Sequence, residues 1–302
     1  MKRRTFLANT SAATTLIGLG GIPLGSCSNL GRKHITILHT NDVHSHIDPF
    51  PATHSKYPNM GGVARRANLV EQIRQENPNT LLLDAGDIFQ GTPYFNFYGG
   101  ELEFKLMSML RYDAATLGNH DFDNGIDGLL AQMPHAGFPM INANYDFSNT
   151  VMDGLVKPYG TFTLEGVKVG VYGLGIALEG LVTKRLYRET VYLDPLEIAL
   201  DMERKLREEE NCHLVICLSH LGHSYGKTDR PSDVRLAKAT QSTDLIIGGH
   251  THTFLERPDV FYNQRELPVL VNQVGCFGLR LGRIDFYLDS AHATAKGVNI
   301  EV

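Results

Sequence analysis

Groups able to bind a metal ion follow five short apolar runs in the sequence. The runs cover residues 35–38, 81–83, 114–117, 214–218 and 245–247. The groups after them are, in chain order, Asp42 and His44, Asp87, Asn119 and His120, His220, and finally His250 and His252. Carboxylate, amide and imidazole groups are common ligands of divalent transition-metal ions. One shared metal centre explains the groups after all five runs more simply than five unrelated surface sites do.

The apolar runs also predict the elements that position these groups. A short continuous apolar run bounded by turn residues is typical of a strand buried on both faces. In open α/β sheets, functional groups gather beyond the carboxyl ends of such strands. We therefore expect an α/β protein whose strand ends converge on one site. Because the residues after the first run still alternate, Asp42 and His44 are expected to project to the same side of an extended segment.

Helical spacing of apolar residues predicts helices between the strands. One expected helix begins at Gly61-Gly62, and three others are expected over residues 101–110, 195–210 and 233–240. In the helix expected over 101–110, one face carries Leu102, Leu106, Met109 and Leu110, and we expect this face to be buried. Further strands are expected at 139–144, in a hairpin over 160–174, and at 268–274, 280–288 and 295–302.

His120 differs from the other metal-binding groups because Asp123 follows it by three residues. If the chain turns helically there, the carboxylate reaches the ring. A carboxylate bound to one ring nitrogen fixes the tautomer and favours the protonated ring. We therefore predict that His120 acts as a general acid, oriented by Asp123, and is not a metal ligand.

Composition restricts the class of protein. The 302 residues are 42% apolar and 20% charged, and they contain no internal repeat, so residues 33–302 are expected to form one globular domain. The formal charge of -5 shows no basic excess, and we expect no binding to nucleic-acid polymers. Cys212, Cys217 and Cys276 have no framework spacing, so no obligatory disulfide is expected.

The first 26 residues resemble a twin-arginine-type lipoprotein signal peptide. Arg3-Arg4 precedes the apolar residues 12–24, which are too short a stretch to span a bilayer as a helix. An ordinary secretory signal is the alternative. Leu24-Gly25-Ser26-Cys27 resembles a lipoprotein processing box, which would make Cys27 the lipid-bearing first residue before a linker over 27–32. Cleavage nearby with a free Cys27 is the other interpretation. We expect an exported protein of the periplasm or cell envelope, held to a membrane only by this lipid anchor.

Taken together, the motifs resemble those of the calcineurin-like metallophosphoesterases and occur in the same order. They are Asp42-X-His44, Gly86-Asp87, Gly118-Asn119-His120-Asp121, Ser219-His220-Leu221-Gly222 and Gly248-Gly249-His250-X-His252. Residues 39–44 and 119–123 resemble the N-terminal metallophosphatase domain of the 5'-nucleotidase branch. The resemblance implies a four-layer α-β-β-α sandwich of two mixed sheets flanked by helices.

The resemblance also implies a site with two divalent metal ions, of manganese, zinc, iron or cobalt. Asp42, His44, Asp87 and His252 would bind one ion, while Asp87, Asn119, His220 and His250 would bind the other. Asp87 would bridge the two ions. A metal-bound hydroxide would attack the phosphorus directly, without a phosphoenzyme intermediate. His120, oriented by Asp123, would stabilise the charge on the transferring group and protonate the leaving oxygen.

Some features depart from that branch. Bacterial relatives usually carry a C-terminal domain that recognises the nucleobase, and this sequence is expected to lack it, so a separate chain is a candidate partner. Position 121 is Asp where the branch often has Glu, and position 252 is His where some members have Gln.

Three hypotheses of function stay open at this point. The first is hydrolysis of nucleotides or other phosphomonoesters. The second is that the same site has the activity of a cyclic-nucleotide phosphodiesterase, a nucleotide-sugar pyrophosphatase or a thiosulfohydrolase. The third is a non-enzymatic metal-binding subunit of an envelope complex, which would not require the pairing of His120 with Asp123.

Overall fold

The computed structural model describes residues 5–7, 32–289 and 292–302. The arginine pair, the apolar stretch after it and Cys27 lie outside the described residues. Predictions that concern the signal peptide and the lipid anchor are therefore not tested by the structure.

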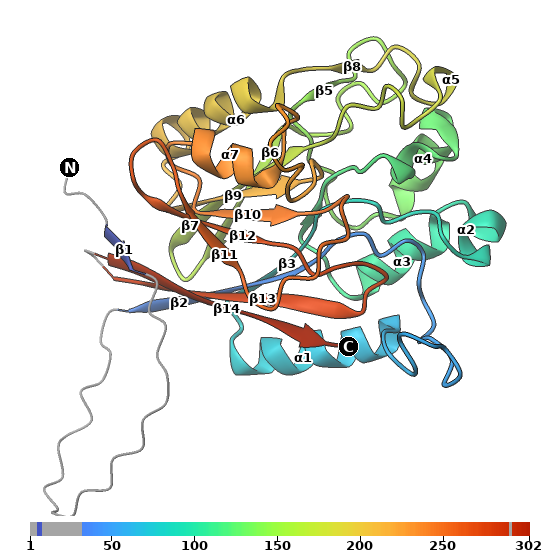
Figure 1. Ribbon diagram of the computed structural model, residues 1–302, viewed down its shortest axis with the longest axis horizontal. Helices are drawn as coiled ribbons and strands as arrows, with labels where there is room; N and C mark the ends of the chain where they lie inside the picture. Colours follow the sequence, from blue (N-terminus) through green and yellow to red (C-terminus); the bar gives the residue numbers. More distant parts are fainter. Residues whose placement is uncertain (1–4, 8–31, 290–291) are drawn as a thin grey trace, which may run out of the picture.

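Two six-stranded sheets lie in the middle of the described part of the chain (Figure 1). In spatial order, the first contains β1 (Thr5–Leu7), β14 (His292–Glu301), β13 (Arg280–Leu288), β2 (Lys33–Thr40), β3 (Thr80–Asp84) and β4 (Ala114–Ala115). The second contains β11 (Asp259–Tyr262), β12 (Pro268–Asn272), β10 (Leu245–Gly248), β9 (Leu214–Ser219), β7 (Val167–Leu174) and β6 (Tyr159–Leu164). A separate short ladder pairs β5 (Tyr145–Asp146) with β8 (Val191–Tyr192).

Helices cover the outer sides of the two sheets. Figure 1 shows α1 (Val63–Glu76) below the first sheet, and α6 (Pro195–Arg204) and α7 (Asp233–Ala239) above the second. The other helical segments are α2 (Pro93–Tyr98), α3 (Glu101–Met109), η1 (His120–Phe122), α4 (Gly125–Gln132), η2 (Met133–His135), α5 (Lys184–Tyr187) and η3 (Lys205–Glu209). No described helix has both the length and the apolarity needed to cross a membrane. The arrangement is the expected four-layer α-β-β-α sandwich of two mixed sheets.

The apolar runs are continuous because each inner strand packs on both faces. Ile37 of β2 and Leu83 of β3 belong to the core between the two sheets. Their neighbours Leu38 and Leu82 belong to a second core, under the helices on the outer side of the first sheet. All four side chains are fully buried. Each contributes on the order of 1.5–3 kcal/mol through burial, so these strands are held firmly behind the loops that follow them.

The five strand ends with metal-binding groups divide between the two sheets. β2, β3 and β4 are parallel neighbours in the first sheet, and β9 and β10 are parallel neighbours in the second. The loops that follow neighbouring parallel strands leave the sheet at the same edge. The site therefore forms where the carboxyl edges of two stacked sheets meet, rather than at the edge of one.

Two predictions outside the candidate site were wrong. Residues 139–144 do not form a strand, because this segment makes only single bridges, between Met140 and Ala115 and between Ile141 and Lys157. In α3, Met109 is 77% exposed, although it was expected in the core. Phe104 takes the inward position instead, since its ring packs 4.8 Å from that of Phe89. A second apolar face overlaps the expected one in this helix, and tertiary packing selects between them.

Candidate metal centre

Asp42 and His44 converge through a loop and not through strand alternation. β2 ends at Thr40, and the backbone φ angles of Asp42 and His44 are 50° and 51°, in the left-handed region. The prediction of an extended segment here was wrong. Instead, the Asp42 N–H donates to the Gly86 carbonyl at 2.9 Å, and the His44 N–H donates to the Asp87 carbonyl at 3.1 Å. The loops after β2 and β3 are thus bound to each other along the floor of the site.

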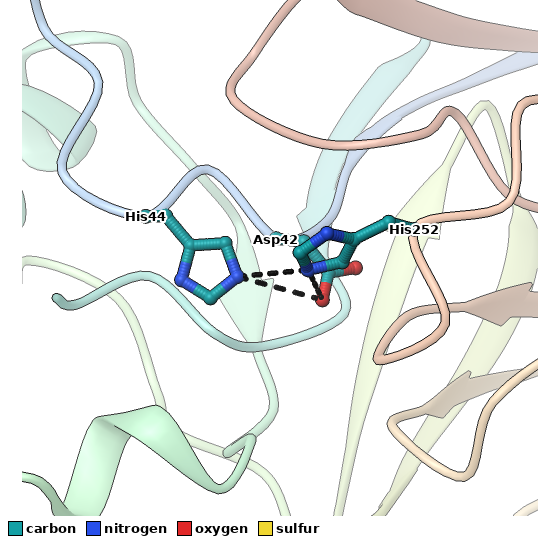
Figure 2. Close-up of side chains that lie close together, drawn as sticks. All are labelled: Asp42, His44 and His252. Atoms are coloured by element: carbon teal, nitrogen blue, oxygen red, sulfur yellow. Dashed lines mark hydrogen bonds and ion pairs between the residues drawn. The ribbon is translucent and has the colours of Figure 1, made fainter. Parts of the chain in front are cut away.

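Asp42, His44 and His252 form the first group of donor atoms (Figure 2). His44 Nε2 lies 2.9 Å from His252 Nε2, and His252 Nε2 lies 3.3 Å from Asp42 Oδ1. His44 Nε2 lies 4.0 Å from the same carboxylate oxygen. Two ring nitrogens that face each other at this distance direct their lone pairs to one region, which is the arrangement that a shared cation requires.

The second group contains Asp87, His220 and His250. His220 Nε2 lies 3.1 Å from Asp87 Oδ2, is fully buried and has no hydrogen-bond partner among the described residues. His250 Nδ1 lies 2.9 Å from Asn119 Oδ1, so Asn119 joins the group. A buried ring nitrogen without a hydrogen bond is unfavourable unless another partner, such as a metal ion, binds it.

Asp87 faces both groups. Its Oδ2 atom lies 3.1 Å from His220 Nε2 and 3.8 Å from His44 Nε2. Burial acts to raise the pKa of Asp87, but the adjacent His220, His44 and His120 rings outweigh burial and hold this pKa below its usual range. The carboxylate is therefore charged, as a ligand shared by two cations must be.

Backbone carbonyl groups orient the rings that carry two of the donor nitrogens. His220 Nδ1 lies 2.7 Å from the Ala85 carbonyl, and His44 Nδ1 lies 3.3 Å from the Phe89 carbonyl. A carbonyl accepts the Nδ1–H of each ring, which leaves the Nε2 lone pair directed into the site. Oxygen and imidazole donors without thiolates suit manganese, iron, zinc or cobalt. The residues therefore fit two divalent ions.

His120 lies at the rim of the site and pairs with Asp123, as predicted. The helical turn η1 brings His120 Nδ1 to 2.7 Å from Asp123 Oδ2. This hydrogen bond raises the pKa of His120, against the opposing effect of burial. The His120 ring is 38% exposed and lies edge-on to the His44 ring, with 5.2 Å between centroids. With Nδ1 bound to Asp123, Nε2 is the nitrogen that can contact a substrate.

Comparison with known proteins assigns the chain to a family. Residues 35–254 match the family described as calcineurin-like phosphoesterase. The chain belongs to this family. Calcineurin-like phosphoesterases depend on a dinuclear metal site, in agreement with the two donor groups.

Several relatives within the family are similar over most of the chain. The trifunctional nucleotide phosphoesterase protein YfkN of Bacillus subtilis is 33% identical over 86% of this chain and 18% of its own length. The human 5'-nucleotidase is 36% identical over 82% of this chain and 42% of its own length. The crystal structure of a 5'-nucleotidase precursor from Thermus thermophilus has a TM-score of 0.79 and 33% identity, covering 89% of this chain and 55% of that one. The chain thus spans little more than half, or less, of each of these relatives.

Asp121 has a role in this calcineurin-like site that the sequence did not reveal. Its buried carboxylate accepts hydrogen bonds from the N–H groups of Gly118, Asp87, Ile88 and Phe89, at 2.8 to 3.1 Å. Burial and the nearby Asp87 carboxylate raise the pKa of Asp121 to about 7, against the opposing effect of these hydrogen bonds. The same hydrogen bonds join the loop that carries Asp87 to the loop that carries Asn119. The motif that contains Asp121 did not reveal this role, because three of the four donors belong to the loop after β3, 32 to 34 residues earlier in the chain.

Asn41 and the loop after β12 also support the first donor group. The Asn41 side chain donates to Asp42 Oδ2 at 2.6 Å and to the Gly275 carbonyl at 2.7 Å. The Phe277 N–H donates to the Asp42 carbonyl at 2.7 Å. Asn41 therefore fixes the carboxylate that faces His44. Its position beside Asp42 was the one sequence signal that could have identified it.

Gly118 lets the two central loops approach each other. A Cβ atom at this position would lie 2.1 Å from Asp87 Oδ1 and 2.6 Å from the Asp87 nitrogen. Such distances are far below van der Waals contact, so no larger residue fits without moving the bridging carboxylate. The requirement for glycine here comes from the close approach of two segments that are remote in sequence.

Buried charges lie behind the loop that carries His44. Arg66 and Glu103 are only 3% and 4% exposed, and they line an internal cavity of about 20 Å³ together with Ser45. The Ser45 hydroxyl, both Glu103 carboxylate oxygens and two of the Arg66 nitrogens have no hydrogen-bond partner among the described residues. Burial raises the pKa of the Glu103 carboxyl above its usual value.

Proposed function

We propose that the protein is a divalent-metal-dependent phosphoesterase that hydrolyses nucleotides or other phosphomonoesters. The observation that carries the proposal is the position of Asp87 between two donor groups, with the paired His120 at their rim. Relatives named 5'-nucleotidase and nucleotide phosphoesterase, similar over most of this chain, favour nucleotides among the phosphate esters.

Each donor group would bind one metal ion. Asp42, His44 and His252 would hold one ion, Asn119, His220 and His250 would hold the other, and Asp87, which faces both groups, would be shared. When bound, two divalent ions supply Lewis acidity and an activated water for in-line displacement at phosphorus.

His120, oriented by Asp123, supplies the proton that the leaving group needs. Asp123 accepts the Nδ1–H of His120, which raises the pKa of the ring, favours its protonated form and leaves Nε2–H for the substrate. Nε2–H first donates a hydrogen bond to the transferring phosphoryl group and then gives its proton to the leaving oxygen. A subunit that only held metal ions would need neither this ring nor its carboxylate, which argues against the non-enzymatic hypothesis.

Phosphate release from a panel of esters tests the proposal. The purified protein with manganese is expected to release phosphate from nucleoside monophosphates and from simple phosphate esters, and to stop after chelation of the metal. Cyclic nucleotides, nucleotide sugars and a thiosulfate ester belong in the same panel, because the same donor groups could serve those reactions. Metal-loaded protein that acts on none of these compounds would contradict the proposal.

We also propose that the protein is exported and lipid-anchored through Cys27. The support is the sequence alone, in which Leu24-Gly25-Ser26-Cys27 follows a short apolar stretch. Cys27→Ser is expected to move the protein from the membrane fraction to the soluble fraction, because acyl chains add about 0.8 kcal/mol of membrane affinity per buried methylene. Fractionation of cells expressing each form measures this shift, and identical membrane association would refute the anchor.

A further inference from the structure

One short loop supplies a ligand to each donor group. Residues 249–253 follow β10 and carry both His250, which belongs to the second group, and His252, which belongs to the first. Because the two ligands are only two positions apart, the shape of this loop determines where both donor groups form. A residue that holds the loop in shape therefore acts on both ion sites at once.

The loop has a backbone conformation that local preference does not maintain. The φ angles of His250 and His252 are 72° and 51°, both in the left-handed region that residues with a Cβ atom rarely adopt. Such residues keep this conformation only where the surrounding structure holds them in it. The support has to come from segments outside the loop.

Gln273 holds the loop from the end of β12. β12 pairs in parallel with β10, and Gln273, the first residue after β12, is fully buried. Its side-chain Nε2–H donates to the Gly249 carbonyl at 2.6 Å, and its Oε1 accepts the Thr253 N–H. These two partners are the first and the last residue of the loop. One side chain therefore binds both ends of the segment that carries the two ligands.

The amide of Gln273 also connects this loop to the one after β9. A carbonyl needs a donor and a backbone N–H needs an acceptor, so Nε2 has to face Gly249 and Oε1 has to face Thr253. Oε1 accepts a second hydrogen bond from the Thr251 hydroxyl at 3.1 Å. The oxygen of this hydroxyl accepts the His223 N–H at 2.9 Å, from the loop after β9. Gln273 is thus joined to loops that carry three of the metal-binding histidines.

Gln273 acts through the loop and not by contact with an ion or a substrate. The amide oxygen is the atom of this side chain that could bind a cation, and it already accepts two hydrogen bonds. The residue has no exposed surface. Residues that orient metal ligands in this way typically change metal affinity by about 10–100-fold when they are substituted.

We propose that Gln273 is a positioning residue that shapes the loop over 249–253 and thereby sets the affinity of both ion sites. The inference rests on the proposed phosphoesterase activity, because it assigns to the metal centre of that activity a residue that touches neither metal nor substrate. Ions would then bind to a loop that is already closed, and their ligands would lose little freedom.

Metal titration of the metal-free protein tests the assignment. Gln273→Met keeps the length of the side chain and removes its polar atoms, and calorimetry with manganese is expected to show both ions bound about 10–100-fold more weakly. Gln264→Met is the matched control, because it makes the same change at an exposed glutamine between β11 and β12. Weakening of one ion alone, or of neither, would overturn the proposal.

Hydrogen exchange separates positioning from a general loss of structure. In the metal-free protein, the amides of residues 249–253 are expected to exchange about tenfold faster in Gln273→Met, while those of β10 and β12 keep their wild-type rates. Gln273→Asn provides a second variant, since it keeps the amide but is one methylene too short to bind both ends of the loop. This variant is expected to weaken both ions as well, and wild-type affinity for both would contradict the positioning role.

The positioning role and the proposed activity can fail separately. If both ions bind more weakly in Gln273→Met but the wild-type protein hydrolyses no ester, the proposed activity fails and the positioning role stands. If the wild-type protein hydrolyses esters but Gln273→Met binds both ions as tightly as wild type, the positioning role fails alone.

Discussion

Asp87→Asn is expected to lose nearly all phosphoesterase activity and to weaken the binding of both metal ions. The carboxylate lies near ring nitrogens of both donor sets, at 3.1 Å from His220 Nε2 and 3.8 Å from His44 Nε2. An amide keeps the size of the side chain but removes the negative charge between two cations. We expect the loss of turnover to exceed the roughly 10²–10³-fold effect that is typical of removing one electrostatic contact.

Metal content separates this role from a general loss of structure. Wild-type protein is expected to retain two ions per chain after dialysis, and the variant fewer than one. Asp153→Asn is a suitable control, since it makes the same chemical change at an exposed aspartate away from the donor groups. Retention of two ions in Asp87→Asn, with a normal thermal transition, would contradict the bridging role.

His120→Asn is expected to lower turnover by about 10²–10⁴-fold while leaving both metal ions bound. The His120 ring is paired with Asp123 and, although it lies edge-on to the His44 ring, supplies no atom to either donor group. Its backbone N–H, which donates to Asp87 Oδ1 at 2.8 Å, is unaffected by the substitution. Asparagine can still donate a hydrogen bond to a phosphoryl oxygen, but it cannot supply the proton that the leaving oxygen requires. The loss should therefore appear mainly in kcat.

The choice of ester provides an internal check on this assignment. Esters whose leaving group is a weak base need little protonation, so their hydrolysis should be impaired less than that of a nucleotide. His135→Asn is the control, because His135 lies in η2 and outside both donor groups. A His120→Asn protein with wild-type kcat, or one that has lost its metal ions, would rule out the general-acid role.

The metal centre owes its rigidity to hydrogen bonds between loops rather than to the strands alone. Asp121 ties together the two loops that carry Asp87 and Asn119, and Asn41 ties the Asp42 loop to Gly275. Preorganised donor atoms lose little freedom when they bind ions or substrate, so binding energy remains available for catalysis. The supporting residues matter for function although they bind neither metal nor substrate.

Most of the fold could be predicted from local pattern. Continuous apolar runs identify inner strands such as β2 and β9, because a strand buried on both faces must be apolar at every position. The hairpin predicted over residues 160–174 is formed by β6 and β7, with its turn at Glu165-Gly166. Segments 139–144 and α3 were less well predicted, since a bridge to Ala115 and the inward face of a helix depend on neighbours far away in the sequence.

The sequence by itself determined which chemical groups this protein places after its inner strands, and in what order. Those groups are side chains at fixed distances from strand ends, and short-range periodicity is enough to recognise them. Only the tertiary structure decided how they meet. The left-handed loop at Asp42 and His44 and the N–H groups of the β3 loop around Asp121 join segments that are distant along the chain. Such contacts arise from packing and hydrogen bonding between elements, which no local pattern of residues encodes.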